Sequence, residues 1–300
     1  MISSRRLSIF VALLFSLLSC GRMLAAQAYI IVDSKNGYVF QEQNSKAKRQ
    51  VGSLTKIAMA MVVLDWAEKH SGDLGQVATV PPEAFNGVTE NFVGFQPGDT
   101  ATLRDLLYAA LVQSDNIAAY TLANHVGQQI TSLVSNAAGP TPVATFVGQM
   151  NALAKTLRME RTRFVNPNGL DSNEKSLPYS TAADMARLTR YAMDRAGFRF
   201  YVSQKERQIS FNRGGKSHSY QLRNTNELLG TNGVEGVKTG RTARAGDCLI
   251  LSAQRQAEIV KLGENRARIY PRHLIIVMLG STNRFPEGQQ LLNLGWQLYD

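Results

Sequence analysis

Residues 52–66, GSLTKIAMAMVVLDW, are apolar around the whole circumference of a predicted helix. The apolar side chains are Leu54, Ile57, Met59, Met61, Val62, Val63, Leu64 and Trp66. A helix that is hydrophobic on all sides is a buried helix, so the rest of the chain must supply layers that cover it. The exception is Lys56, which stands in the first turn, three residues after Ser53.

The spacing of Ser53 and Lys56 places both side chains on one face of the helix, near its N-terminus. Burial and the positive end of the helix dipole both disfavour an ammonium group, so we expect a lowered pKa for Lys56. A serine beside a base is the arrangement of an activated nucleophile. The S-x-x-K pattern also occurs at Ser45 and Ser172, in polar stretches where a capping serine and a solvated lysine are the ordinary interpretation. The apolar setting distinguishes Ser53.

The first 28 residues have the pattern of a secretory signal peptide. Arg5 and Arg6 precede an apolar run over residues 9–18, and small residues follow the run. Ala26-Gln27-Ala28 fits the A-x-A rule for cleavage before Tyr29. The pattern predicts an exported protein of the periplasm or cell envelope.

An alternative for the same segment is a lipidated N-terminus. Leu17-Leu18-Ser19-Cys20 resembles a bacterial lipobox, which would anchor the processed chain through Cys20. The core of the apolar run is too short for a comfortable membrane span, so an uncleaved anchor is the third interpretation. We expect any membrane attachment to involve the N-terminus only.

The numbers and spacing of the cysteines and histidines argue against an internal disulfide and against a metal site. If the leader is removed, Cys248 is the remaining cysteine, so we expect no internal disulfide, and its setting in DCLILSA predicts a buried strand. The four histidines are scattered without metal-ligand spacing. We therefore expect neither a metal nor another cofactor.

The chain has a formal net charge of +10, of which Arg5, Arg6 and Arg22 account for three, leaving +7 after residue 28. This surplus favours anionic surroundings such as phospholipid or wall polymer, and it is equally compatible with ordinary solubility. Basic and aromatic residues do not combine into a nucleic-acid surface, so no nucleic-acid partner is expected.

Strand-like segments lie at both ends of the predicted mature domain, residues 29–300. YIIVD and YVFQEQN flank an Asn-Gly turn, the strongest short-range hairpin signal. GVKTGRTARAG, DCLILSAQ and RHLIIVMLGST are three further predicted strands, and QISFNRGGKSHSYQL is a predicted hairpin. Helical periodicity marks segments between them, including residues 103–111, IAAYTLANHVG and a helix capped near Thr181. PEGQQLLNLGWQLYD is a further predicted amphipathic helix, at the C-terminal end. This order predicts an α+β fold, with one antiparallel sheet built from both chain ends and an inserted helical subdomain.

Three short motifs, distant from one another, follow in a fixed order along the chain. They are Ser53-x-x-Lys56, Ser114-x-Asn116 and Lys238-Thr239-Gly240. S-x-N also occurs at residues 34–36 and 281–283, whereas K-T-G occurs once. The motifs lie at a helix start, in an interhelical loop and on a strand, and these elements can converge on one cleft.

This ordered set is typical of class A β-lactamases and penicillin-binding proteins. The chain resembles the low-molecular-mass penicillin-binding proteins, the serine D-alanyl-D-alanine carboxypeptidases. The resemblance covers nearly all of residues 29–300 and includes GSLTKI, QSDNIAA, FVNPNGLD, YSTAADMARL, VEGVKTGRT and LGSTNRF. It implies a β-lactamase/transpeptidase-like fold, peptidoglycan stem peptides as substrates and β-lactams as covalent inhibitors.

The resemblance implies catalytic roles for four residues. Ser53 attacks the carbonyl between two D-alanines to form an acyl-enzyme, and Lys56 accepts the serine proton as a neutral amine. Ser114 relays a proton to the leaving amine, aided by Lys238. Asn116 holds the substrate amide and orients Lys56.

The resemblance also implies a substrate-binding set on and beside the K-T-G strand. Its members are Lys238, Thr239, Gly240, Arg241 and Arg284. The strand would pair with the extended peptide as an added strand, and the backbone N–H groups of Ser53 and Arg241 would form the oxyanion hole. Thr239 and Arg284 suit the terminal carboxylate of the substrate.

Four features depart from the family pattern. Asn168 stands in N-P-N-G-L where relatives commonly carry histidine, and Arg241 follows K-T-G where a smaller residue or histidine is common. Gly52 replaces the usual alanine before the nucleophile. The chain stops after its terminal predicted helix, without the extra β-domain and amphipathic anchor of many carboxypeptidases, which also fits the D,D-endopeptidases of this family.

Two other functions compete with peptide hydrolysis. A class A β-lactamase needs a deacylating glutamate in an E-x-x-x-N setting, but Glu160 is followed four places on by Phe164 and Glu174 by Pro178. A non-catalytic wall-binding or β-lactam-sensing protein could have kept the fold, but all seven motif residues are present, which argues against decay of the site. A purely structural protein would have no reason to keep a buried Lys56 beside Ser53. The sequence therefore predicts a penicillin-sensitive D-alanyl-D-alanine carboxypeptidase, with a cross-link endopeptidase as the first alternative.

Overall fold

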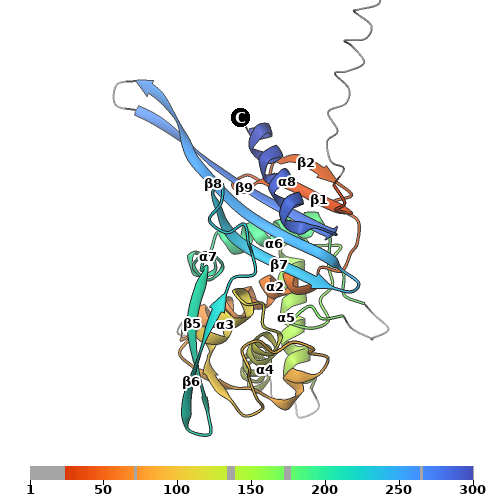
Figure 1. Cartoon of the computed structure of the whole chain (residues 1–300), viewed down its shortest axis with the longest axis vertical. Coiled ribbons are helices and arrows are strands. Elements are labelled where there is room, and N and C mark those ends of the chain that lie inside the picture. Colours follow the sequence, from red (N-terminus) through yellow and green to blue (C-terminus); the bar gives the residue numbers. More distant parts are fainter. Residues whose placement is uncertain (1–23, 71–72, 134–138, 172–176, 264–265, 300) are drawn as a thin grey trace, which may run out of the picture.

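The computed structural model describes residues 24–70, 73–133, 139–171, 177–263 and 266–299. They form a large antiparallel sheet and a helical region flanked by a smaller sheet (Figure 1). Most of the predicted leader, including Cys20, lies outside the described residues. No helix within these ranges has the length and hydropathy that a bilayer span requires.

The larger sheet is assembled from both ends of the sequence, which confirms the predicted α+β fold. Its order is β2-β1-β9-β8-β7, with all neighbours antiparallel. Its strands are β1 (Ala28–Asp33), β2 (Val39–Gln43), β7 (Val234–Thr242), β8 (Gly246–Gly263) and β9 (Arg266–Ser281). β8 and β9 extend well beyond the predicted DCLILSAQ and RHLIIVMLGST segments, because they continue as a two-stranded ribbon that leaves the body of the protein (Figure 1).

The helical region is inserted between the two groups of strands. Its helices are α2 (Lys56–Lys69), α3 (Leu103–Leu111), α4 (Asn116–Ser132), α5 (Pro142–Thr156), α6 (Ala182–Met193) and α7 (Ala196–Val202), while α8 (Arg284–Tyr299) lies at the C-terminal end. Most side chains of α2 are buried, as its apolar circumference predicts. The cap at Thr181 is confirmed, because its hydroxyl accepts a hydrogen bond from Asp184 N–H at 3.0 Å.

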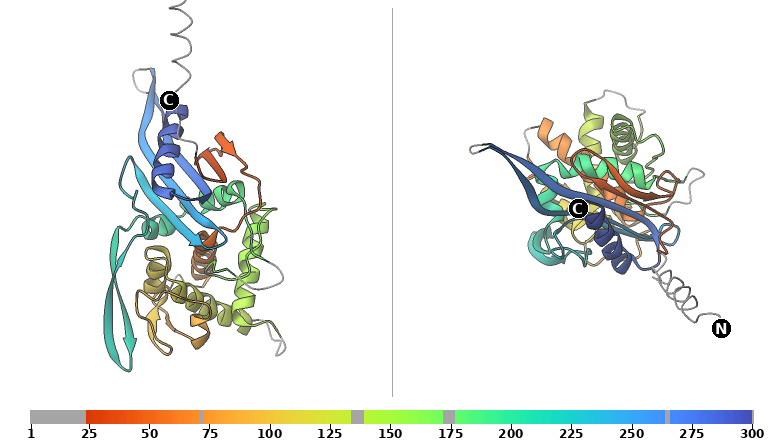
Figure 2. Two further views of the ribbon diagram at one scale, coloured as in Figure 1. Left: turned by 45° about the vertical axis from the view of Figure 1, so that its right-hand side comes forward. Right: turned by 90° about the horizontal axis from the view of Figure 1, so that it is seen from above.

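The two faces of the larger sheet are covered by different elements, because side chains alternate along a strand. On β9, Ile275 and Val277 join the core shared with the helical region, whereas Ile276 and Met278 join a second core with Trp296 of α8. Figure 2 shows α8 lying along the outer face of the sheet. The sheet is therefore buried on both sides, and its position relative to the helical region is fixed by the core.

The smaller sheet is only partly predicted by the sequence. Its order is β3-β4-β5-β6, with β3 (Val77–Thr79), β4 (Thr100–Thr102), β5 (Glu206–Arg213) and β6 (Lys216–Arg223). The predicted hairpin is β5-β6, closed by Gly214 and Gly215 at positive φ. β3 and β4 have only three residues each, too few to show a periodicity.

Part of the predicted leader is packed against the sheet. Ala26 is buried, and its backbone N–H donates to the buried Glu287 carboxylate at 2.8 Å. Gln27 N–H donates to Leu279 O at 3.1 Å, and Ala28 begins β1. Cleavage before Tyr29 stays a prediction, and it would remove all of these contacts.

Candidate active site

The site is built around the Lys56 side chain, which is fully buried at the start of α2. Its Nζ lies 2.9 Å from Ser53 Oγ, 2.7 Å from Asn116 Oδ1 and 2.9 Å from the backbone oxygen of Asn168. Ser53 belongs to a 3₁₀ turn, Gly52–Thr55, rather than to the α-helix itself. Residues i and i+3 eclipse in a 3₁₀ turn, so the predicted meeting of Ser53 and Lys56 is preserved.

The three neighbours of Lys56 allow it to act as a base. Burial lowers the pKa of Lys56 to about 7, although the nearby Asp115 carboxylate opposes the shift. A neutral amine has two N–H donors and one lone pair. The oxygens of Asn116 and Asn168 can only accept hydrogen bonds, so the two donors serve them. The lone pair is then left for the Ser53 hydroxyl, as the removal of a serine proton requires.

The loop between α3 and α4 supplies the second motif. Ser114 has a positive φ of 67°, and Asn116 is the first residue of α4. Between them Asp115 is the N-cap, and its Oδ1 accepts a hydrogen bond from Ala118 N–H at 2.7 Å. Burial raises the pKa of Asp115, while this N–H and the charge of Lys56 oppose the shift. The cap therefore fixes the start of α4, from which Asn116 reaches Lys56.

The loop that contains Asn168 closes over the 3₁₀ turn. Asn168 is buried, and it meets Lys56 through its backbone carbonyl, while its side-chain Oδ1 accepts from Leu170 N–H at 3.1 Å. The contact to Lys56 is therefore independent of which side chain stands at position 168. This geometry accounts for a position where the sequence departs from the family pattern.

Glycines permit the close approach of three segments at this point. A Cβ on Gly169, which has a φ of +81°, would lie 2.0 Å from the backbone oxygen of Gly52. Gly52 itself has a φ of +53°, and a Cβ on Gly240 would lie 2.8 Å from Val51 O and 3.2 Å from Ser53 N. The glycine that replaces alanine before the nucleophile thus occupies left-handed backbone space.

We expect Gly169→Ala to slow acylation by a fluorescent penicillin by roughly 100-fold, because a displacement of about 1 Å in supporting groups costs about this much. The Asn168 carbonyl would move away from Lys56. Gly215→Ala is the matched control, since Gly215 has a φ of +78° and open space around its Cβ position. Labelling rates and Tm are measured for both variants. Equal slowing in both would contradict the importance of this packing.

The third motif lies on β7, at the edge of the larger sheet. Lys238 is buried, and its Nζ donates to the backbone oxygen of Thr239 at 3.0 Å. Burial lowers the pKa of Lys238 well below its ordinary value, and the charges of Lys56 and Arg284 lower it further. Thr239 Oγ1 lies 2.6 Å from the hydroxyl of Thr225, a neighbour that the sequence did not indicate.

Two arginines meet at the end of β7, and a buried carboxylate holds both. Asp247 accepts from Arg241 Nε at 2.5 Å and from Arg284 Nη1 at 3.3 Å. Arg284 Nη1 also donates to Gly240 O at 3.1 Å. The side chain of Arg241 is 70% exposed and that of Arg284 is 19% exposed. Asp247, which sequence reasoning missed, therefore fixes the more buried Arg284 beside the K-T-G strand.

These groups border one cavity of about 300 Å³. It is lined by Ser53, Glu90, Phe92, Gln113, Ser114, Asp115, Asn116, Leu170, Thr225, Thr239, Gly240, Arg241 and Arg284. Seven of the nine predicted site residues are in this lining, while the buried Lys56 and Lys238 lie behind it. Glu90 and Phe92 come from a loop without helical or strand periodicity, so no sequence signal pointed to them.

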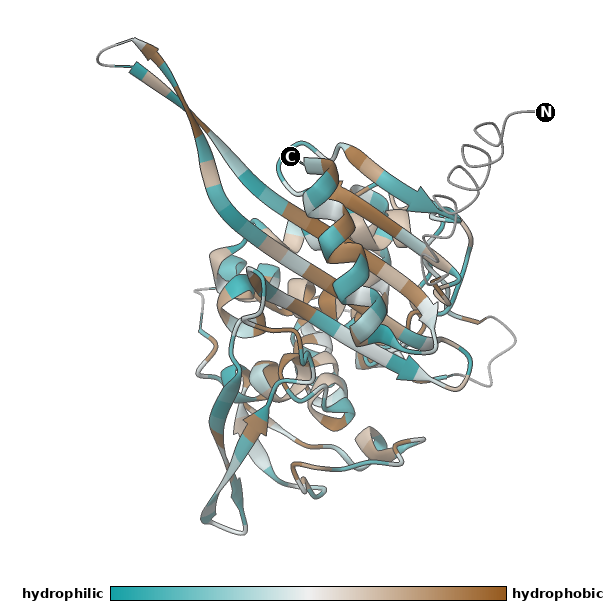
Figure 3. Cartoon of the chain, turned by 45° about the horizontal axis from the view of Figure 1, so that its top comes forward, coloured by the Kyte–Doolittle hydropathy of each residue, from teal (hydrophilic) through white to brown (hydrophobic). Residues whose placement is uncertain are grey.

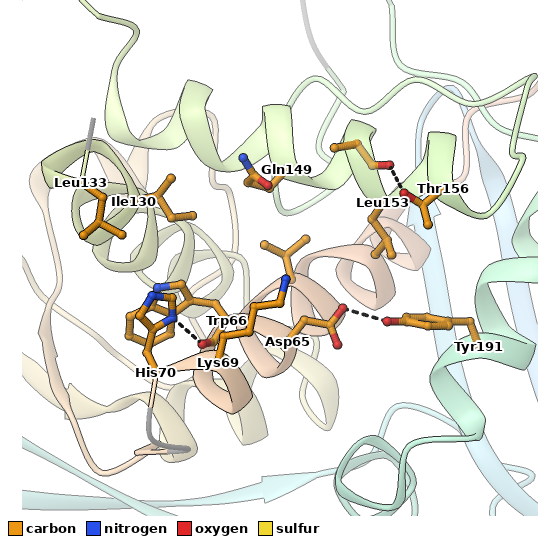
Figure 4. A pocket seen from close by; sticks show the side chains of 12 residues that line it. Asp65, Trp66, Lys69, His70, Ile130, Leu133, Gln149, Leu153, Thr156 and Tyr191 are labelled. Atoms are coloured by element: carbon orange, nitrogen blue, oxygen red, sulfur yellow. Dashed lines mark hydrogen bonds between the residues drawn. The ribbon is translucent and has the colours of Figure 1, made fainter. Parts of the chain in front are cut away.

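A second cavity, of about 460 Å³, lies among α2, α4, α5 and α6 (Figure 4). Asp65 accepts a hydrogen bond from the Tyr191 hydroxyl there, and His70 stacks on Trp66. Its lining holds no serine or cysteine beside a base. The first cavity is therefore the candidate active site. In the part of the chain that the structure describes, no cluster of three or more His, Cys, Asp or Glu residues is placed to hold a metal.

Solved structures with the same fold define the class of protein. The Streptomyces K15 DD-transpeptidase matches with a TM-score of 0.75 and 26% identity, over 91% of this chain and 98% of that one. Penicillin-binding protein D2 from Listeria monocytogenes, in an ampicillin-bound form, matches with a TM-score of 0.70 and 26% identity over the same shares of the two chains. The fold is thus that of penicillin-binding DD-peptidases.

Residues 19–262 match the D-alanyl-D-alanine carboxypeptidase family, peptidase S11, and the chain belongs to this family. The resemblance noted in the sequence is thereby confirmed. D-alanyl-D-alanine carboxypeptidase DacC of Escherichia coli is 31% identical over 287 residues, 92% of this chain and 62% of the relative. A D-alanyl-D-alanine endopeptidase of Pseudomonas aeruginosa is 30% identical over 230 residues, 76% of this chain and 67% of the relative. The chain thus spans about three fifths of the length of the carboxypeptidase.

Proposed function

We propose that this protein is a penicillin-sensitive D-alanyl-D-alanine carboxypeptidase that acts on peptidoglycan stem peptides through a serine acyl-enzyme. The observation that carries the proposal is the position of Lys56 Nζ, 2.9 Å from Ser53 Oγ and held by two acceptors. Membership in the family supports the choice of substrate. We further propose that the protein is exported to the periplasm or cell envelope with cleavage before Tyr29, and that lipidation at Cys20 is the alternative to this cleavage.

In the first step Ser53 Oγ attacks the carbonyl carbon between the two D-alanines, and its proton passes to Lys56. The negative charge that develops on the carbonyl oxygen would be stabilised by the N–H groups of Ser53 and Arg241. Support comes from the close packing of the two segments, since a Cβ on Gly52 would lie 3.3 Å from Arg241 N.

Departure of the terminal D-alanine requires a proton on its nitrogen. Ser114 borders the cavity, and we assign it the relay of that proton, with Lys238 behind it. The peptide would add to the free edge of β7 as a further strand, as the position of β7 at the end of the sheet allows. Water then attacks the acyl carbon and the bond from that carbon to Ser53 Oγ breaks. A proton from the water returns to Ser53 Oγ, and the shortened peptide is released.

Cleavage of cross-links is the second candidate function, because some relatives are named endopeptidases. The two functions use the same acyl-enzyme and differ in the leaving amine. Digestion of purified muropeptides separates them: free D-alanine from pentapeptide monomers is expected, with dimers consumed more slowly. Loss of dimers without release of D-alanine would identify an endopeptidase. Absence of both products would contradict a peptidase.

We expect Arg284 to bind the terminal carboxylate, with Thr239 as its neighbour in the cavity. Truncation of one partner of a buried, charge-paired contact costs about 2–5 kcal/mol, or roughly 30-fold to several thousand-fold. Arg284→Ala should slow turnover of a D-Ala-D-Ala peptide to this extent and barely affect the same peptide with an amidated end. Arg241→Ala is the comparison, because its exposed side chain should change turnover only a few-fold. If Arg284→Ala slows both peptides alike, its role is to support Gly240 O instead.

A further inference from the structure

The long β8-β9 hairpin projects beyond the elements that cover the rest of the sheet (Figures 1 and 3). β7 pairs with β8 as far as Ala253, and β1 pairs with β9 as far as Leu274. Beyond these positions the two strands pair only with each other, among the described residues. We name residues 255–263 and 266–272 the distal ribbon.

The distal ribbon exposes large apolar side chains on both of its faces. Ile259 lies opposite Ile269, and these side chains are 60% and 63% exposed. Val260 and Tyr270 each follow a member of this pair by one residue, so they point to the other face. There they are 37% and 43% exposed and border a cavity that Tyr299 of α8 also lines. Leu262, next to the turn, is also exposed. Clustered exposed apolar side chains of this size mark an interaction site.

The distal ribbon also carries a strong positive charge. The described ribbon carries one carboxylate, Glu258, and five cations, namely Arg255, Lys261, Arg266, Arg268 and Arg272. Arg255 and Arg272, at its base, lie over the rings of Trp296 and Tyr299 of α8. Lys261, Arg266 and Arg268 lie within the same few residues as the exposed apolar side chains. Cations interspersed with aliphatic and tyrosine side chains complement an anionic phospholipid surface, where headgroups attract the charges and the acyl boundary accepts the apolar groups.

We propose that the distal ribbon is a membrane-docking element that inserts its tip into an anionic phospholipid surface. A groove on a partner protein would cover one face of the ribbon, whereas a lipid interface surrounds an inserted tip and so accommodates apolar side chains on both faces. A soluble anionic polymer would use the cations and leave the isoleucines exposed. This inference does not depend on the proposed peptidase activity, and it departs from the expectation that any membrane attachment involves the N-terminus only.

The position of the ribbon keeps the candidate site clear of the lipid. Asp247, which holds Arg241 and Arg284, lies at one end of β8, and Leu262 lies at the other. At about 3.3 Å per residue, the strand between them spans roughly 50 Å. A docked tip would therefore leave the cavity at a distance from the bilayer.

Tryptophan emission tests the proposal site by site. Ile259→Trp is made in the full-length chain, purified as the producing cell processes it, and mixed with vesicles of phosphatidylglycerol and phosphatidylethanolamine. We expect a blue shift and quenching by lipids brominated in the acyl chains, weakening as salt rises. Ile269→Trp is the second reporter. Val77→Trp, at a 57% exposed position of β3, is the control that should change little even if the N-terminus holds the protein on the vesicle.

A variant without three of the ribbon cations tests whether electrostatic attraction to the lipid headgroups contributes to insertion. Lys261→Gln, Arg266→Gln and Arg268→Gln, added together to Ile259→Trp, should weaken insertion roughly 100-fold, at about tenfold or less per cation. The matched control carries Lys46→Gln, Lys155→Gln and Lys216→Gln, at three exposed positions outside the ribbon, together with Ile259→Trp. Its insertion should be nearly unchanged. Tm should stay unchanged in both.

Three results would each overturn the proposal. They are absence of quenching in anionic vesicles, equal insertion into phosphatidylcholine vesicles, and a blue shift that depends on protein concentration without lipid. The last result would identify a second copy of the chain as the occupant.

Discussion

Ser53→Ala is expected to abolish covalent labelling by a fluorescent penicillin, with turnover of D-Ala-D-Ala peptides lowered by roughly 10⁶-fold. Removal of a serine nucleophile eliminates the acyl-enzyme route, and losses of about this size are found in serine peptidases. The folded protein should be retained, because Ser53 contributes only a hydroxyl at a half-buried position of the 3₁₀ turn. Labelling is followed by gel fluorescence and mass spectrometry of the labelled peptide, with Tm as the check on folding.

The lifetime of the label on the unmodified protein carries further information. We expect it to persist, since the chain lacks the E-x-x-x-N setting of a class A β-lactamase. Glu90 borders the cavity, so Glu90→Gln is the informative companion variant. An unchanged lifetime is expected. Label that vanishes within seconds, and that Glu90→Gln preserves, would instead establish a β-lactamase with Glu90 as its deacylating base. Undiminished labelling of Ser53→Ala would show that another residue is the nucleophile.

Acylation by penicillin should rise with pH and reach half of its maximum near pH 7. Burial lowers the pKa of Lys56 to about 7, and the proton acceptor must be the neutral amine. Lys56→Arg keeps a positive charge that cannot be released in this range, so acylation should fall by about 10²–10⁴-fold at every pH. Lys155→Arg, at an exposed position of α5, is the control. Near-normal acylation by Lys56→Arg would disprove the role as proton acceptor.

The same pKa shift affects stability with a definite sign. Between about pH 7 and the ordinary lysine value of about 10.4, the unfolded chain binds a proton that folded Lys56 has lost. The free energy of unfolding should therefore rise with pH across this window. In Lys56→Met this contribution should disappear. Urea unfolding at several pH values measures the free energy of unfolding of the unmodified protein and of Lys56→Met. If this free energy depends on pH identically in the two proteins, Lys56 is not a buried neutral amine.

The predictable part of the site is the part that depends on residue type and order. Ser53, Lys56 and Asn116 were predicted to meet, and they meet, because each motif lies on the kind of element that its local sequence favours. The Asn168 contact could not be predicted, since it is made by a backbone oxygen that every residue carries. Asp247 could not be predicted either, because its contact with Arg241 depends on the register of β7 against β8.

Some elements of the fold could likewise be predicted from the sequence, and others could not. The helix at α2 and the sheet from both chain ends follow from hydrophobic patterns that extend over many residues. β3 and β4 are too short for such a pattern, and Thr100 of β4 is recognisable as part of a strand only through its partners, Thr79 on β3 and Asn212 on β5. The distal ribbon mixes charged and apolar residues without a clean alternation, so the sequence predicted shorter strands than the protein has.

The pairing of β1 with β9 has a consequence for how the protein folds. Ala28 and Leu279 are neighbours in the sheet although about 250 residues separate them along the chain. Contacts at such separations are slow to form, because the entropy of closing the loop must be overcome before the pairing stabilises anything. The helices and the β1-β2 hairpin can form from local contacts, whereas the pairing of β1 with β9 requires β9 to have been synthesised. The motif residues on α2, α4 and β7 come together only when the intervening chain has condensed, so competence to react with penicillin should be among the last properties a refolding molecule acquires.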